Sequence, residues 1–203
     1  MQKNLEGLNP LEEFQSVFLH LPRLETERLI LRRVRLRDAQ DMFVYSKDDE
    51  VSRHVLWDTH KTLSDSVACC RAIKRQYRYG LPSTFAIELK ETGHMIGTIG
   101  FMWINTEHRS AEVGYSLSRA YWNRGLTTEA LRKVLEFAFE DLDLHRVEAQ
   151  YEVDNPASGR VMEKCGMTCE GLMHDRVFNK GHYSDVYVYA ILKNQFEGER
   201  NYV

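Results

Sequence analysis

The feature that most restricts the fold of this chain is a strand, a glycine-containing turn and a helix within residues 111–142. Apolar side chains alternate with polar ones from Ala111 to Leu117, which is the period of a half-buried strand. Apolar residues then recur at helical spacing from Leu131 to Leu142. The sequence therefore predicts a strand that turns through residues 119–131 into a long helix.

This turn is a candidate anion site. The first N–H groups of a helix lack acceptors within the helix, and the helix dipole adds partial positive charge there, so a phosphate suits the position. Gly125 permits close approach of the backbone, Arg124 adds a cation, and Thr127 and Thr128 add hydroxyls. The alternative is a glycine that only makes the turn. Neither a three-glycine dinucleotide fingerprint nor a Gly-Lys-Ser/Thr phosphate loop is present.

Composition sets the broad class of protein. With 203 residues and 43% apolar content, the chain suits one globular domain. Its net charge of −3 argues against broad binding to nucleic acid or to anionic membranes. No apolar stretch reaches about 18 residues, and the N-terminus lacks the apolar core of a signal peptide. We therefore expect a cytoplasmic protein without membrane attachment.

The cysteines indicate no metal centre. Cys69, Cys70, Cys165 and Cys169 have no paired histidines nearby at zinc-finger spacing. Reduced thiols in a cytosolic protein account for them best, and we expect no metal site.

Periodicity predicts alternating helices and strands. Helices are expected over residues 8–19, over 38–47 with Asp38 as cap, and from Thr62 or Ser64 to before Gly80. The helix that follows the Gly125 turn is expected to end at about Leu142, and a last helix to run from Pro156 to Gly166. Strands are expected over residues 29–34, 84–89, 95–103, 109–118, 146–153, 167–177 and 183–192. Residues 48–61 are expected to form a loop, and the tail from residue 194 to be polar and loose.

After the first helix, the order β-α-α-β-β-β-α-β-α-β-β predicts an α/β fold. Its central sheet is expected to be mixed and mostly antiparallel, with about seven strands and with helices on both faces. The expected segments are an N-terminal extension with a short helix (1–22), one domain (23–193) and a polar tail (194–203). The first helix is expected to pack on the domain or on a second subunit, which would make a homodimer.

A second group of polar residues lies at the start of the last helix. Asn155 ends a strand and Ser158 lies in the first helical turn. Both could reach a ligand held between this strand and the 111–118 strand. The alternative is helix capping alone, since Asn-Pro and Ser are common at helix starts.

Together these motifs resemble the GNAT N-acetyltransferases, and most closely their RimJ/RimL-type protein N-terminal acetyltransferases. The resemblance covers about residues 23–193. It is carried by the segments Leu24–Arg32, Ala111–Tyr115, Tyr121–Ala130, Asn155 with Ser158, Glu163–Met167 and Glu170–Gly171. The chain departs from the family pattern at Trp122 and Thr127, the first and last positions of the phosphate loop, and at Met162, where many GNAT enzymes carry a tyrosine acid.

The resemblance implies acetyl-CoA as co-substrate. Its pyrophosphate would lie on the amides of residues 124–128, and its pantetheine arm between two strands that splay apart, residues 112–118 and 147–153. The implied cofactor-binding residues are Ser116, Leu117, Asn123, Arg124, Gly125, Leu126, Thr127, Thr128, Asn155 and Ser158. The amine would attack the thioester directly, so no cysteine needs to act as nucleophile.

Proton transfer identifies two candidate catalytic residues. An α-amine is already roughly 10–20% neutral at pH 7, whereas a lysine amine is only about 0.04% neutral, so a modest base suffices for an N-terminus. Glu112 is the candidate base, acting through water, and it lies on the opposite sheet face from Val113. A structural salt bridge is the alternative. Ser158 is the candidate hydrogen-bond donor to the leaving thiolate.

The acceptor is expected to be a protein N-terminal α-amine, such as that of a ribosomal protein. Alternatives are a small amine, such as a polyamine or amino sugar, and, in another class, a non-catalytic acyl-CoA sensor. An open groove would favour a peptide, and a closed acidic pocket a small amine. Candidate acceptor-site residues are Arg53, Trp57, Tyr115, Arg176 and Tyr183, with surface packing as the alternative for each.

Overall fold

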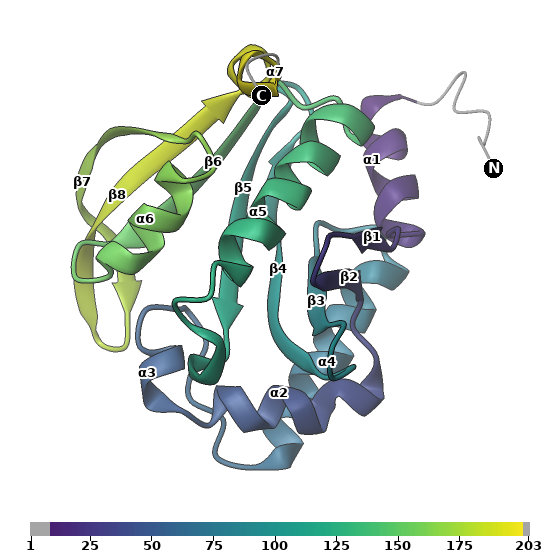
Figure 1. Ribbon diagram of the computed structural model, residues 1–203, viewed down its shortest axis with the longest axis vertical. Helices are drawn as coiled ribbons and strands as arrows, with labels where there is room; N and C mark the ends of the chain where they lie inside the picture. Colours follow the sequence, from purple (N-terminus) through teal and green to yellow (C-terminus); the bar gives the residue numbers. More distant parts are fainter. Residues whose placement is uncertain (1–8, 201–203) are drawn as a thin grey trace.

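The computed structural model describes residues 9–200, which form an eight-stranded sheet flanked by helices (Figure 1). The strands are β1 (Leu24–Glu25), β2 (Leu29–Arg33), β3 (Thr84–Leu89), β4 (Met95–Asn105), β5 (Ser110–Leu117), β6 (Arg146–Glu152), β7 (Thr168–Asn179) and β8 (His182–Leu192). The helices are α1 (Pro10–Leu19), α2 (Ala39–Ser46), α3 (Asp49–Ser52), α4 (Leu63–Arg78), α5 (Leu126–Glu136), α6 (Pro156–Glu163) and α7 (Lys193–Arg200). Short 3₁₀ turns lie at Leu36–Asp38 and Arg119–Tyr121, and a π-helical turn at Phe137–Asp141 continues α5.

The sheet has the order β1-β2-β3-β4-β5-β6-β8-β7. Neighbouring strands are antiparallel except β5 and β6, which are parallel. This confirms a mixed, mostly antiparallel sheet. The eighth strand is β1, whose two residues pair with β2 and are too few to give a readable period in the sequence.

Helices cover both faces of this sheet, as expected. Helix α2 packs against α4, and α5 packs against α6. Figure 1 shows α5 and α6 in front of the sheet and α4 behind it. Helix α1 buries Phe14 and Phe18 in the core of its own chain, so its apolar face is used within the domain, and a homodimer stays a prediction.

Strands β5 and β6 separate part-way along their length. They pair only from Ser110 to Glu112 on β5, opposite Arg146 to Glu148 on β6. Strand β5 then continues to Leu117 and β6 to Glu152 without a shared rung. The splay implied by the family resemblance is therefore present, and it leaves two strand faces available to a ligand.

Two segments are more ordered than expected. The predicted loop at 48–61 contains the one-turn helix α3, with the Asp48 carboxylate accepting from the Glu50 amide at 3.1 Å. The tail from residue 194, expected to be loose, continues helix α7 as far as Arg200. The Phe196 ring lies 5.2 Å from the Phe139 ring. One turn, or one apolar anchor, is too little for periodicity to reveal a helix.

Asp38 does not cap α2 as predicted, because its side chain makes no cap hydrogen bond. Its carboxylate instead accepts from both terminal nitrogens of Arg32, at 2.7 and 3.0 Å, and from the Arg35 amide at 2.6 Å. Arg32 also donates through Nε to Glu88 at 2.5 Å. Arg32 and Asp38 are both buried, and a buried guanidinium needs a paired anion, a requirement that outweighs capping.

Candidate active site

The turn before α5 has the backbone geometry of an anion site. Gly125 precedes the helix with a φ of 73°, a left-handed conformation that favours glycine. The first helical bond runs from the Glu129 amide to the Gly125 carbonyl, at 3.0 Å. The amides of Leu126, Thr127 and Thr128 therefore have no acceptor within the helix, and all three residues line a cavity.

Arg28 of β2's entry loop holds this turn in place. Its Nη1 donates to the Arg124 carbonyl at 2.9 Å, and its Nε donates to the Glu129 carboxylate at 2.7 Å. The Thr26 hydroxyl also donates to Glu129, at 2.6 Å. Burial alone would raise the pKa of Glu129, but these hydrogen bonds lower it. The link joins residues about 100 positions apart, and no local pattern could have indicated it.

One cavity of about 640 Å³ runs from this turn, between the separated ends of β5 and β6, to the segment after α3. It is lined by most of the predicted site residues. They are Trp57, Glu112, Tyr115, Ser116, Leu117, Asn123, Gly125, Leu126, Thr127, Thr128, Asn155 and Ser158.

Four predicted site residues do not line the cavity: Arg53, Arg124, Arg176 and Tyr183. Arg53 forms a 3.7 Å ion pair with Asp154. The Arg124 guanidinium lies 5.3 Å from the centre of the Tyr121 ring. Tyr183 packs on Phe178, with ring centres 5.0 Å apart. Arg176 reaches the site only electrostatically, through its charge near Glu112.

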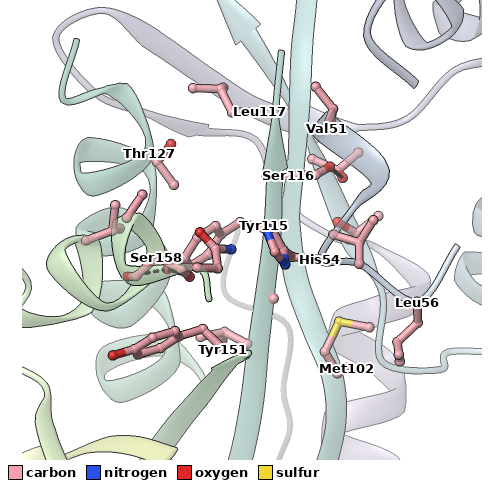
Figure 2. A pocket seen from close by; sticks show the side chains of 18 of the residues that line it. Val51, His54, Leu56, Met102, Tyr115, Ser116, Leu117, Thr127, Tyr151 and Ser158 are labelled. Atoms are coloured by element: carbon pink, nitrogen blue, oxygen red, sulfur yellow. Dashed lines mark hydrogen bonds between the residues drawn. The ribbon is translucent and has the colours of Figure 1, made fainter. Parts of the chain in front are cut away.

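Tyr115 and Ser158 meet on the α6 side of β5. Their hydroxyl oxygens are 2.8 Å apart, and the Tyr115 hydroxyl also lies 3.1 Å from the Ser158 carbonyl. Figure 2 shows this pair beside Tyr151 and Thr127, with Leu56 and Met102 across the strand.

The close fit of α6 against β6 brings Ser158 to this position. A side chain at Gly159 would place its Cβ 2.7 Å from the Tyr151 ring, so only glycine permits the contact. Burial raises the pKa of Tyr115, which keeps its hydroxyl protonated and able to donate. The sequence suggested Tyr115 as a wall of the acceptor site but gave no sign of this pairing.

Glu112 lies on the other face of β5, since side chains alternate along a strand. Its carboxylate accepts from Trp103 Nε1 at 2.8 Å and from Gln150 Nε2 at 3.3 Å. Burial raises the pKa of Glu112, and the charge of the nearby Glu148 raises it further. The two hydrogen bonds and the charge of Arg176 lower the pKa in part, but the net shift is upward. Trp103 reaches Glu112 because a bulge in β4 shifts the register between Phe101 and Trp103.

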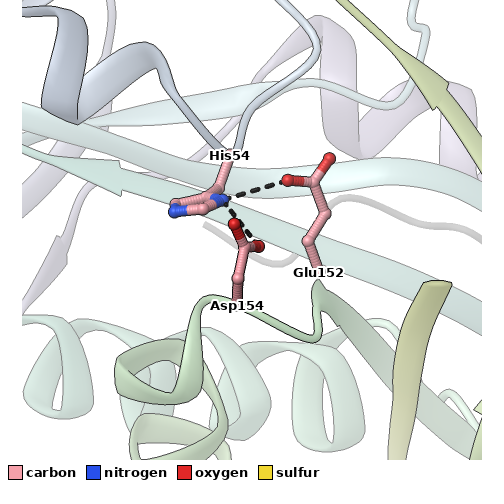
Figure 3. Close-up of side chains that lie close together, drawn as sticks. All are labelled: His54, Glu152 and Asp154. Carbon is pink, nitrogen blue, oxygen red and sulfur yellow. Dashed lines mark hydrogen bonds and ion pairs between the residues drawn. The ribbon is translucent and has the colours of Figure 1, made fainter. Parts of the chain in front are cut away.

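A histidine and two carboxylates form a cluster that the sequence did not indicate. His54 Nδ1 lies 3.0 Å from Glu152 and 3.3 Å from Asp154 (Figure 3). Their ligand atoms lie within 4.8 Å of one another, close enough to hold a metal ion. His54 and Glu152 also line the cavity. The residues are about 100 positions apart, which is why periodicity did not connect them.

Comparison with known proteins assigns the family. The chain matches the acetyltransferase (GNAT) domain family over residues 28–168. It belongs to the GNAT N-acetyltransferases. This enzyme is 35% identical over 175 residues to the uncharacterized N-acetyltransferase p20 of Bacillus licheniformis, covering 86% of this chain and 98% of p20. The crystal structure of a GNAT-family acetyltransferase from Bacillus anthracis superposes with a TM-score of 0.76 at 28% identity, over 85% of this chain and 99% of the other.

Relatives with named acceptors differ from one another. The ribosomal-protein-serine acetyltransferase of Escherichia coli is 30% identical over 133 residues, covering 66% of this chain and 69% of its own. The spermidine N(1)-acetyltransferase of Vibrio cholerae is 29% identical over 103 residues, covering 51% and 60%. RimL, a ribosomal L7/L12 α-N-protein acetyltransferase solved with coenzyme A, shares the fold with a TM-score of 0.75 at 19% identity, over 84% and 98%. Among residues 9–200, no helix of the enzyme combines the length and apolarity needed to cross a bilayer.

Replacing Gly125 with valine is expected to weaken acetyl-CoA binding about tenfold, equivalent to about 1.4 kcal/mol. A Cβ there would meet only Arg28 Nη2, at 3.7 Å, so the cost comes from the left-handed backbone. The turn should relax and move its amides. Isothermal titration calorimetry measures the effect.

Gly93→Val is the matched control for this prediction. Gly93 lies in a turn between β3 and β4 with a φ of 70°, and no atom beyond its chain neighbours lies within 4 Å of where a Cβ would be. It should suffer the same backbone strain and keep wild-type acetyl-CoA affinity. Equal affinities in the two variants would contradict the assignment of the turn.

Proposed function

We propose that this enzyme acetylates a protein N-terminal α-amine, using acetyl-CoA and direct attack of the amine on the thioester. The observation that carries the proposal is the arrangement across β5. A carboxylate with a raised pKa, Glu112, lies on one face of the strand, and a hydroxyl pair, Tyr115 with Ser158, lies on the other. One cavity reaches both.

The end of the cavity near α5 suits the anionic part of acetyl-CoA. Open amides at the α5 N-terminus favour a pyrophosphate. The negative charge of Glu129, in the same helical turn, is paired with Arg28. Arg160 and Lys164 of the α6 region add cations to the cavity lining. Acetyl-CoA would supply the activated acetyl group, and the chain would supply its placement between β5 and β6.

The opposite end of the cavity suits an acceptor whose positively charged amine is one end of a longer molecule. The carboxylates of Glu50, Glu112 and Glu152 line it, and they favour the arrival of an ammonium group. Leu56 and Met102 line it as well, although they are 71% and 58% exposed. The opening of the cavity at Leu56 and Met102 therefore exposes apolar surface. A peptide whose first residue lies in the cavity would extend across this surface. The E. coli relative that acetylates a ribosomal protein supports this acceptor class.

The two faces of β5 divide the proton transfers. Glu112, whose pKa is raised by burial, accepts a proton from the attacking amine. On the other face, the Ser158 hydroxyl donates a hydrogen bond to the departing sulfur. Tyr115 orients Ser158 through their 2.8 Å contact. A CoA thiol has an ordinary pKa near 8.5, so this assistance needs to be only slight.

Ser158→Ala is expected to lower kcat about tenfold, the effect of one lost hydrogen bond of about 1–1.5 kcal/mol. Tyr115→Phe should lower kcat less, because Ser158 keeps its hydroxyl and loses only its partner. Neither variant should change the Kd of acetyl-CoA. Tyr183→Phe, outside the cavity lining, is the control and should match wild type. If Ser158→Ala has the same kcat as the wild-type enzyme, Ser158 does not assist the departure of the CoA sulfur.

A small polyamine is the second candidate acceptor, because the carboxylates at the acceptor end also suit a polycation. A panel of amines separates the candidates: peptides with free N-termini, the same peptides N-acetylated but with an internal lysine, spermidine and glucosamine. We expect kcat/KM for free N-termini to exceed that for spermidine at least tenfold, with no turnover of blocked peptides. If kcat/KM is higher for spermidine than for free N-termini, the acceptor is a polyamine and not a protein N-terminus. Acetyl-CoA binding without transfer to any amine would instead indicate a sensor.

A further inference from the structure

In the proposed reaction an acceptor that arrives as an ammonium has two protons to lose. An ammonium loses one proton before it can attack and a second as the C–N bond forms. Only one of these is matched by the proton that ends on the CoA thiol, so one is released to solvent. At pH 7 about 80–90% of an N-terminal amine arrives protonated. Glu112 accounts for one proton, and a second base at the acceptor end of the cavity would let the protonated majority of the amine react as well.

We propose that His54 is the acceptor of the first proton, held in place by Glu152 and Asp154; this inference rests on the proposed function. A neutral imidazole donates through one nitrogen and accepts through the other. The carboxylates lie 3.0 and 3.3 Å from Nδ1, so the proton resides on Nδ1 and the lone pair on Nε2. Figure 3 shows Nε2 at the far side of the ring from both carboxylates.

Nε2 is accessible to an acceptor amine. Within residues 9–200 no hydrogen bond to Nε2 of His54 is present, and no buried side-chain nitrogen or oxygen there lacks a partner. Nε2 is therefore not buried. His54 and Glu152 both line the cavity, so the proposal places this open nitrogen toward the acceptor amine.

The surroundings keep His54 in this orientation. Burial alone would raise the pKa of Glu152, but hydrogen bonds from Asn179, at 2.9 Å, and from His54 lower it. Glu152 therefore stays ionised and can stabilise an imidazolium. Lys180 donates to the carbonyls of Val55 and Trp57, at 2.7 and 3.2 Å, which ties the segment carrying His54 to the β7–β8 turn.

Other charges near this pair are of both signs. Arg53 pairs with Asp154 at 3.7 Å, and His182 acts through its charge on Glu152. Glu50 lines the cavity from α3.

His54 and Glu112 both contact side chains of β6. Gln150, which donates to Glu112, and Glu152, which holds His54, lie two residues apart on one face of β6. Two residues span about 7 Å of a strand, so the partners of the two proton acceptors occupy successive positions on the same face of β6. In the first step an ammonium N–H bond breaks, its electron pair stays on the amine nitrogen, and the proton bonds to Nε2. His54 then releases this proton to solvent, and Glu112 takes the second proton.

His54→Gln tests the proposal through the pH dependence of kcat/KM for a peptide with a free N-terminus. Without the acceptor, only the neutral amine reacts, so kcat/KM should fall about six- to elevenfold at pH 7 and converge with wild type near pH 9. Glu152→Gln should give the same pH-dependent loss, and acetyl-CoA Kd should not change in either variant.

His94→Gln is the matched control. His94 also presents Nδ1 to a carboxylate, Asp41, at 3.0 Å, but its side chain is 67% exposed and does not line the cavity. Its kcat/KM should equal wild type at every pH.

Three results would overturn the proposal. The first is a kcat/KM of His54→Gln at pH 7 that equals that of the wild-type enzyme. The second is a loss of kcat/KM in His54→Gln that stays constant from pH 7 to pH 9. The third is that a chelator removes the activity of the wild-type enzyme and Zn²⁺ restores it. The last would make the cluster a set of metal ligands. If the wild-type enzyme acetylates spermidine and no peptide, only the proposed peptide acceptor is overturned. The His54→Gln test is then carried out with spermidine as the acceptor.

Discussion

Glu112→Gln should lower kcat by about 10²- to 10⁴-fold, the usual contribution of a positioned general base. Glutamine keeps the shape of the side chain, and its one amide oxygen can still accept from Trp103. Its NH2 group then faces Gln150, whose own amide must turn to accept, and the side chain cannot take up a proton. Because Glu112 lies on the opposite face of β5 from Tyr115 and its partner Ser158, we expect the acetyl-CoA affinity not to change. Stopped-flow or steady-state assays with a peptide acceptor, together with calorimetry, measure the two quantities.

The pH profile gives a second test of Glu112. A base acts only when deprotonated, and burial raises the pKa of Glu112 above that of an ordinary carboxyl. Activity should therefore fall as pH drops through this raised value, and the acid limb should disappear in Glu112→Gln. Glu91→Gln, in the exposed turn after β3, is the control and should keep the wild-type profile. Wild-type kcat in Glu112→Gln would exclude Glu112 as the base.

Asp38→Ala should destabilise the fold by about 3–5 kcal/mol, the cost of removing one partner of a buried ion pair, with Glu88 left as the remaining partner of Arg32. The Arg32 and Asp38 side chains are only 6% and 4% exposed, so water cannot replace the lost carboxylate. A domain of this size loses about 2–4 °C of Tm per kcal/mol, which predicts a shift of about 6–20 °C in thermal denaturation.

Two further variants show whether the unpaired charge causes this loss. Adding Arg32→Leu to Asp38→Ala should recover part of the Tm, since the incompletely paired buried guanidinium is gone, and Glu88, whose side chain is 18% exposed, can be hydrated. Asp49→Ala removes an exposed ion pair with Lys61 and should leave the Tm almost unchanged. Equal shifts for Asp38→Ala and Asp49→Ala would show that the buried pair has no special importance.

Local patterns predicted most of the elements of this fold. The strand expected at 84–89 is β3 over the same residues, because its apolar run ends at clear turn signals. The turn at Gly125 and the helix after it were also correct. The strands before and after this turn, β5 and β6, were predicted as elements, but their limited pairing came only from the family resemblance.

The candidate site was predicted in part. Glu112 and Ser158 line the cavity, as do nine of the ten expected cofactor-binding residues, Ser158 among them and Arg124 the exception. Among the expected acceptor residues, only Trp57 and Tyr115 line it. Residues of turns and strand ends are fixed by local geometry, whereas the outer wall of a cavity depends on which distant loops fold over it.

The sequence by itself determined the alternation that makes β5 a strand, the glycine that turns it into α5, and the motifs that identify the family. All of these depend on backbone conformation within a few residues. Tertiary structure alone decided that Tyr115 meets Ser158, that Gln150 reaches Glu112, and that His54 is held by Glu152. These partners lie 43, 38 and 98 positions apart. They meet because β6 pairs briefly in parallel with β5 and then diverges, and pairing between distant strands leaves no period in the chain.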